Sequence, residues 1–165
     1  MKKLSTIALL FLILLSGCIN WNDDRDLPKS DYEPVILSRT EFEDAISLAS
    51  PKIILETGKI YIFSNYLFIN EPNKGFHIFN NSNPSNPIKI GFLDVPGSTD
   101  IAIKNNIFYV NSAVDLIAIK INPSYSSLEI TKRVKNIFPV MNSPDGFAYY
   151  DLQENEIIIN WILKD

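Results

Sequence analysis

The chain of 165 residues contains one cysteine, Cys18, and one histidine, His77. A single thiol excludes an intramolecular disulfide and a Cys-x-x-Cys redox site, and together with one histidine it supplies too few ligands for an ordinary zinc site. The six glycines form no phosphate-binding loop and no dinucleotide fingerprint. The apolar segment from Leu4 to Leu15 has twelve residues, whereas a helix that spans a bilayer needs about 20. The sequence therefore predicts no cofactor, no metal and no lasting transmembrane helix.

The N-terminus has the three parts of a secretory signal. Lys2 and Lys3 form a cationic start, the apolar segment follows, and the small residues Ser16 and Gly17 precede Cys18. We therefore expect residues 1–17 to be a signal peptide that is removed.

The run Leu15-Ser16-Gly17-Cys18 resembles the lipobox of bacterial lipoproteins. The resemblance implies that the Cys18 thiol is lipidated and that the new amino terminus is acylated. Several acyl chains on one residue make a durable anchor, because each buried methylene adds about 0.8 kcal/mol. The alternatives are an ordinary cleaved signal with an incidental cysteine and an uncut signal anchor. We expect an envelope protein held to the outer membrane through Cys18, periplasmic or surface-exposed.

The charge and composition of the remaining 148 residues indicate a folded, acidic domain. Loss of Lys2 and Lys3 leaves 13 basic against 19 acidic residues, a net charge of about −6. This balance argues against nucleic acid as a partner, since nucleic acids are held mainly through Lys and Arg. A hydrophobic content of 46%, with 12% aromatic residues, is well above that of a disordered chain.

Residues 18–37 are predicted to form a flexible tether, because they combine an acidic cluster with prolines and have no apolar periodicity. Asp23-Asp24 resembles the export signal of Bacteroidetes surface lipoproteins, and a solvated linker is the alternative. Calcium binding by Asp23, Asp24 and Asp26 is disfavoured, because the spacing lacks the glycine and distal glutamate of a calcium loop.

Residues 38–50 are predicted to form a helix. Ser38 and Glu41 match the capping box, and Pro51 ends the segment. The apolar positions that share one helical face are Phe42, Ala45, Ile46 and Ala49. A helix that covers an edge or end of a sheet is favoured over a helix that binds a partner.

From residue 51 to 138 the chain reads as strands and turns. Short apolar runs separated by Asn, Ser, Gly and Pro predict strands near residues 57–63, 66–71, 76–80, 88–95, 99–104, 107–111, 115–121 and 128–136. Because no helix intervenes, a parallel α/β sheet is excluded. The predicted fold class is all-β, with one short N-terminal helix.

An internal repeat groups these strands in fours. Residues 59–70 match residues 100–111 at an offset of 41, and each copy contains two apolar strands around a Ser/Asn-Asn turn. The downstream strands also correspond, so the copies cover about 57–97 and 98–138. Four strands in about 40 residues indicate a propeller blade.

Residues 75–87 resemble the LVIVD repeat, whose third strand is followed by a Ser-x-Pro-x-x-Pro turn. The resemblance implies a bacterial lipoprotein built from β-propeller blades, in a family largely without assigned activity. Because propellers have about four to eight blades, two repeats predict an incomplete propeller, the N-terminal part of a longer protein, with residues 139–165 as the start of a further repeat or a tail. A freestanding small β domain is the alternative.

Few residues suggest chemistry. His77 lies inside a strand and is interpreted as structural, since no nucleophile and base can be assembled around it. Four carboxylates could meet in a propeller channel, although solvated turn positions are the simpler interpretation: Asp94, Asp100, Asp115 and Glu129. Asparagines that could line a sugar-binding face fit turns better: Asn70, Asn80, Asn81, Asn83, Asn86, Asn105, Asn106 and Asn111. Trp161 is expected to pack.

The sequence therefore predicts a lipid-anchored, non-catalytic binding or scaffold module for a protein or glycan partner. An envelope enzyme acting on glycans, with active residues in missing blades, and a nonfunctional truncated product are the alternatives. Cys18 is the only residue with a predicted chemical role.

Overall fold

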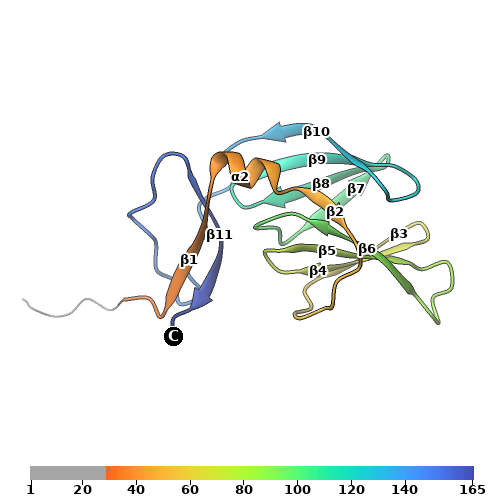
Figure 1. The fold of residues 1–165 in the computed structure, drawn as a ribbon, viewed down its shortest axis with the longest axis horizontal. Coiled ribbons are helices and arrows are strands. Elements are labelled where there is room, and N and C mark those ends of the chain that lie inside the picture. The colour runs from red at the N-terminus through yellow and green to blue at the C-terminus, as the bar shows by residue number, and fades with distance from the viewer. Residues whose placement is uncertain (1–28) are drawn as a thin grey trace, which may run out of the picture.

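The computed structural model describes residues 29–165, so the predicted signal peptide, Cys18 and the acidic cluster of the tether lie outside the described residues. The described chain is all-β, with three antiparallel sheets and one short helix. Figure 1 shows two sheets stacked one above the other and a two-stranded sheet across one end of them.

The first repeat forms the strands β3 (Ile60–Phe63), β4 (Tyr66–Glu71), β5 (Gly75–Asn80) and β6 (Ile88–Asp94). The second forms β7 (Ile101–Lys104), β8 (Ile107–Ser112), β9 (Asp115–Ile121) and β10 (Leu128–Val134). In each repeat, every strand pairs antiparallel with the next. The prediction of two four-stranded antiparallel units is confirmed.

The turn between the first two strands of each repeat contains the Ser/Asn-Asn pair that the sequence repeat predicts. Asn105 and Asn106 have φ of 51° and 60°, and Ser64 has φ of 53°. Short polar side chains tolerate this left-handed conformation better than β-branched ones. The turn residues therefore explain why both repeats start with the same hairpin.

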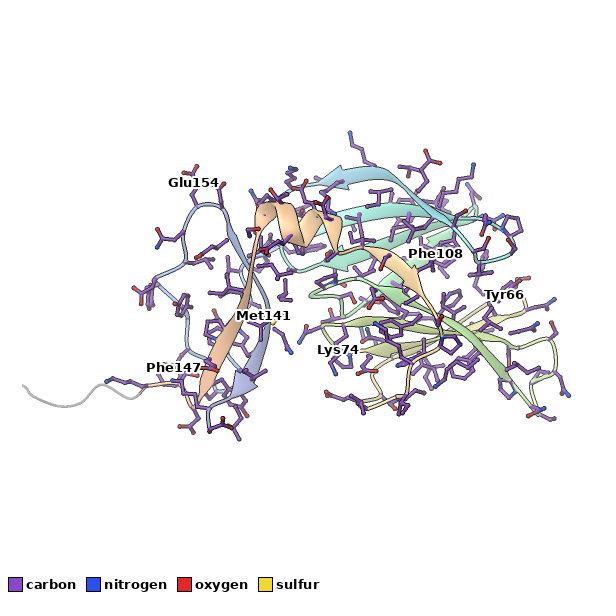
Figure 2. The ribbon with its side chains drawn as sticks, in the orientation of Figure 1. Tyr66, Lys74, Phe108, Met141, Phe147 and Glu154 are labelled. Atoms are coloured by element: carbon purple, nitrogen blue, oxygen red, sulfur yellow. The ribbon has the colours of Figure 1, made fainter. Side chains whose placement is uncertain are left out.

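The main core lies between the two repeats. Phe68, Phe76 and Ile78 of the first repeat and Val110 and Ile117 of the second are fully buried there. Because side chains alternate along a strand, each repeat gives only one of its two faces to this core. Tyr66 and Phe108 lie in this region in Figure 2.

The predicted helix is shorter than 38–50. α2 covers Arg39–Asp44, and its capping box is confirmed, with Ser38 Oγ accepting from the Glu41 amide and Glu41 Oε2 accepting from the Ser38 amide. Residues Ser47–Ala49 form β2 instead and pair with Phe92 to Asp94 of β6, which gives the first sheet a fifth strand. The apolar periodicity favours a helix here, but hydrogen bonds to the backbone of the sheet edge favour a strand, and the strand forms.

The helix packs over an end of the sheets, as expected. Phe42 is buried in a second cluster with Ala113, Val114 and Ile157, whereas Ile46 reaches the main core. Phe42 and Ile46, which were expected on the same face of one helix, thus lie in separate clusters.

The two-stranded sheet joins distant parts of the chain. β1 (Tyr32–Ser38) pairs antiparallel with β11 (Glu156–Leu163). Residues 32–37 are therefore strand rather than tether, because β11 supplies a partner that is far away in sequence. Residues 139–165 do not build another four-stranded unit in the described chain, and they contribute one strand, β11.

Candidate binding groove

A groove of about 650 Å³ lies beside the β1–β11 sheet, where residues 147–151 run past it. Five aromatic side chains form much of its wall: Tyr32, Phe147, Tyr149, Tyr150 and Trp161. Charged residues complete the lining: Lys29, Glu33, Asp151 and Lys164. Phe147 and Met141 mark this part of the chain in Figure 2. The size is in the range of about 300–1,000 Å³ that is typical of small-molecule sites.

A tight turn positions the aromatic segment. The Ser143 hydroxyl accepts from the Phe147 amide at 2.8 Å and donates to Asp145 at 2.5 Å, and the Ser143 amide donates to the Phe147 carbonyl at 2.9 Å. Gly146 completes the turn with φ of 91°, a conformation that side chains disfavour. Phe147 is therefore held at a fixed place at the start of the segment.

Asp145 ties this turn to the strand β1. Its carboxylate accepts from the Asp31 amide and from the Ser30 hydroxyl, both at 2.8 Å. Desolvation raises the pKa of Asp145, but hydrogen bonds from Ser143, the Asp31 amide and Ser30 outweigh it and keep the pKa below its ordinary value. The charged form of Asp145 thus holds the two walls of the groove together.

Trp161 forms the floor. Its side chain is largely buried, and its indole N–H donates to the Met141 carbonyl at 3.2 Å. Tyr149 lies edge-on to it, with ring centroids 6.4 Å apart. Trp161 packs as expected, and it also lines the groove. Tyr150, by contrast, is 91% exposed.

This arrangement suits recognition of an extended ligand. Tyrosine and tryptophan offer a rigid apolar surface with a polar group at the edge, so they stack on a ligand and hydrogen-bond to it at a low entropic cost. Charged residues of both signs at the rim can orient the ligand. The groove therefore has the lining of a candidate binding site.

His77 occupies a structural site in β5. It is fully buried, its Nε2 lies 2.7 Å from Glu71 Oε2, and Lys74 donates to the other Glu71 oxygen at 2.7 Å. Desolvation raises the pKa of Glu71, but hydrogen bonds from Lys74 and His77 outweigh it and lower that pKa. Phe92 packs against the imidazole at 4.6 Å between ring centroids. The structural interpretation of His77 fits this enclosure.

The carboxylates considered for a channel have separate partners. Asp94 pairs with Lys52 at 2.5 Å, and Asp100 pairs with Lys59 at 2.6 Å. Burial, together with the neighbouring Asp100, raises the pKa of the Tyr61 phenol to about 12. Glu129 is exposed on β10.

Asp115 is the exception, since it is wholly buried. It accepts from Arg39 at 2.7 Å, from Arg133 at 2.9 Å and from the Asn136 amide at 3.0 Å. The arginines connect α2 and β10, so this carboxylate holds the helix on the second repeat. Its role is structural.

The asparagines serve the backbone. Asn70 donates to the Gly75 carbonyl at 3.0 Å, and its repeat counterpart Asn111 accepts from the Asp100 amide at 2.8 Å. Asn80 and Asn83 accept from amides two residues ahead. These bonds are typical of turns and strand ends, where the sequence interpretation put the asparagines.

Among residues 29–165, no cluster of three or more histidine, cysteine or acidic side chains could hold a metal ion. Within the same range, every helix is too short to cross a bilayer.

The groove was missed by sequence reasoning. Phe147, Tyr149 and Tyr150 are close together in a segment that forms no strand, and this density of aromatic residues was the available signal. The pairing of β1 with β11, which supplies the opposite wall, left no local pattern.

No protein family, curated protein or solved structure matches this chain.

Proposed function

We propose that the chain is a lipid-anchored protein of the cell envelope or cell surface, and that its β domain serves as a non-catalytic binding or scaffold module. In this proposal Cys18 carries the anchor, and the aromatic groove holds a protein or glycan partner. The propeller-like repeats act as the rigid support on which that groove is displayed.

The groove is the observation that carries the binding role. It has aromatic walls, a charged rim and a volume of about 650 Å³, which are features of recognition sites. Tyr150 is almost fully exposed and is tied to no other side chain by an aromatic contact in the described chain. A partner that stacked on it would remove apolar surface from water, which favours binding.

The anchor is tested with Cys18→Ser. Because Cys18 is the only thiol of the chain, the substitution should abolish labelling by a fatty-acid probe and move the protein from the membrane fraction to the soluble fraction. Ser16→Ala is the control, since it keeps a small residue before the cysteine and should keep full labelling. Unchanged labelling of Cys18→Ser would refute the anchor.

The binding role is tested on a glycan array and on an array of extended peptides, with the full chain in detergent. Tyr150→Ala should weaken binding about tenfold or more, since an exposed aromatic anchor accounts for about 1.4 kcal/mol or more of binding energy. Phe138→Ala is the control, because Phe138 is a partly exposed aromatic residue outside the groove lining. Tryptophan fluorescence gives a second readout from Trp161 in the groove once Trp21→Phe has removed the other tryptophan of the chain. Binding to neither array, or equal binding by Tyr150→Ala, would contradict the proposal.

A further inference from the structure

The two repeats pack through different faces. We call face A the sheet face that carries Phe68 in the first repeat, together with the equivalent face of the second repeat. Face B is the opposite sheet face of each repeat, and in the second repeat it carries Phe108. Phe68 and Phe108 meet edge to face, with ring centroids 5.4 Å apart. Face A of the first repeat is therefore joined to face B of the second. Within residues 29–165, no sheet packs on face B of the first repeat or on face A of the second (Figure 1).

Face B of the first repeat carries the same kinds of residues as its buried counterpart. At the offset of 41, Ile60 and Ile62 correspond to Ile101 and Ile103. Ile101 is 5% exposed in the core, whereas Ile60 and Ile62 are 60% and 69% exposed. Tyr61, between them, points to the core, so the two isoleucines are on the other face. The first repeat thus keeps two exposed isoleucines at positions that are occupied in the second repeat by isoleucines packed in or against the core.

Face A of the second repeat has an apolar centre, which is hollowed, with Lys104, Lys120 and Glu129 at one end of the strands. Tyr109, the counterpart of Phe68, is 40% exposed, and it lines a hollow of about 310 Å³ with Ile107, Leu116, Ala118 and Val134, while Thr131 and Lys132 form its polar side. Ile107 is the counterpart of Tyr66, which packs against the core. The hollow therefore lies where the first repeat receives its neighbour.

The polar contact between the repeats can also recur. Lys59 donates to Asp100 at 2.6 Å, and these two residues occupy the same position of the repeat. If face A of one second repeat received face B of another first repeat, Asp100 would again lie opposite a Lys59. Lysine and aspartate would then alternate along the stack, whereas identical residues at this position would repel one another.

One segment covers part of face B. Residues 50–58 cross it at the His77 end, where Lys52 Nζ lies 4.4 Å from the Phe92 ring. Ile62 and Leu67 are at the opposite end of the strands, beside the β3–β4 turn, and that end stays open.

We propose that a second copy of this chain docks head to tail, with face B of its first repeat on face A of the second repeat. Such a heterologous contact uses two different surfaces and closes into a ring when the rotation permits. Rings of about four to eight repeats are the sizes found for propellers, which corresponds to about two to four copies. The copies thereby cover both apolar faces.

Native mass spectrometry of the full chain in detergent tests the assembly. The expected mass is that of about two to four copies. Ile62→Lys and Tyr109→Lys should each give a single copy, because each puts a charge on one face while the side chain replaced is exposed enough to leave folding intact. Tyr150→Lys is the control, since it is exposed outside both faces and should keep the wild-type mass. A single copy for the wild type, or an unchanged mass for both face variants, would overturn the proposal.

Cross-linking tests the direction of docking. By correspondence with Phe68 and Phe108, Tyr109 of one copy should meet Leu67 of the next. In chains that also carry Cys18→Ser and so have no other thiol, a mixture of Leu67→Cys and Tyr109→Cys should therefore be joined by a short thiol cross-linker, whereas either variant alone should not. Strong cross-linking of a single variant would indicate a two-fold symmetric dimer and overturn the head-to-tail arrangement.

Discussion

Asp115→Ala is expected to lower the free energy of unfolding by about 3–5 kcal/mol. The substitution removes a fully buried carboxylate from between Arg39 and Arg133, whose side chains are only 20% and 10% exposed. Both guanidinium groups would then lack their main partner, and the Asn136 amide would lose its acceptor. The cost arises chiefly from leaving charges and donors without a partner where water has little access.

Asp100→Ala is the matched control. Asp100 also pairs with a basic residue, but its side chain is 54% exposed and that of Lys59 is 62% exposed. Water replaces such a partner, so a loss of about 1 kcal/mol or less is expected. Urea denaturation followed by circular dichroism measures both variants. Equal losses for the two aspartates would show that the Asp115 cluster has no special role in stability.

Acid should reveal the same cluster. Burial raises the pKa of Asp115, but the Asn136 amide and the two guanidinium groups outweigh it, so the pKa in the folded chain lies below its ordinary value of 3.8. A lowered pKa contributes stability that is complete above the ordinary value and is lost as the pH falls through the lowered one. Asp115→Ala should therefore lose less stability than the wild type when the pH is taken below 3.8.

The strands of the repeats were predictable because their signal is local. β4, β5, β8 and β9 lie within a residue of their expected bounds. Alternating or continuous Ile, Val, Phe and Tyr runs bounded by Asn and Gly leave few alternatives. The internal repeat with its offset of 41 residues also predicted that the strands are grouped in fours, which the pattern of a single strand does not reveal.

The pairing of β1 with β11 was not predictable by the same reasoning. Val35 pairs with Asn160, and no sequence pattern near either residue indicates that the two are partners. The acidic and proline-containing neighbourhood of β1 favoured a tether. The sequence did not predict β2 for a related reason. Its three residues continue the apolar periodicity of the preceding helix, and they form a strand only because they pair with the edge of β6.

The candidate site depends on those long-range pairings. Trp161 and Tyr32 reach the groove only because β11 and β1 lie side by side, and the Asp145 carboxylate accepts from the amide of Asp31, directly before β1. Buried polar contacts were equally hidden, since nothing in the sequence ties Arg39 to Asp115. Local signals predict elements well, but a site assembled from distant segments requires the fold.

Phe42→Ala is expected to cost about 3–5 kcal/mol of folding free energy, the range for a buried phenylalanine. Phe42 is fully buried, and it packs with Ala113 and Val114 of the second repeat and with Ile157 of β11. Phe138→Ala, at a partly exposed phenylalanine, should cost about 1 kcal/mol or less. Thermal or urea denaturation compares the two variants.

The place where Phe42→Ala destabilises the structure shows whether Phe42 attaches the β1–β11 sheet to the second repeat or is an ordinary core residue. The guanidinium carbons of Arg39 and Arg133 lie 5.5 and 5.4 Å from the Phe42 ring centroid, so the ring also holds the arginines that bind Asp115. Removing it loosens both the apolar and the ionic contact between the β1–β11 sheet and the second repeat. Hydrogen exchange should therefore accelerate more in β1 and β11 than in β5, which lies in the first repeat. Uniform acceleration in all strands would contradict this role, because the sheet that carries the groove would then have no separate attachment to lose.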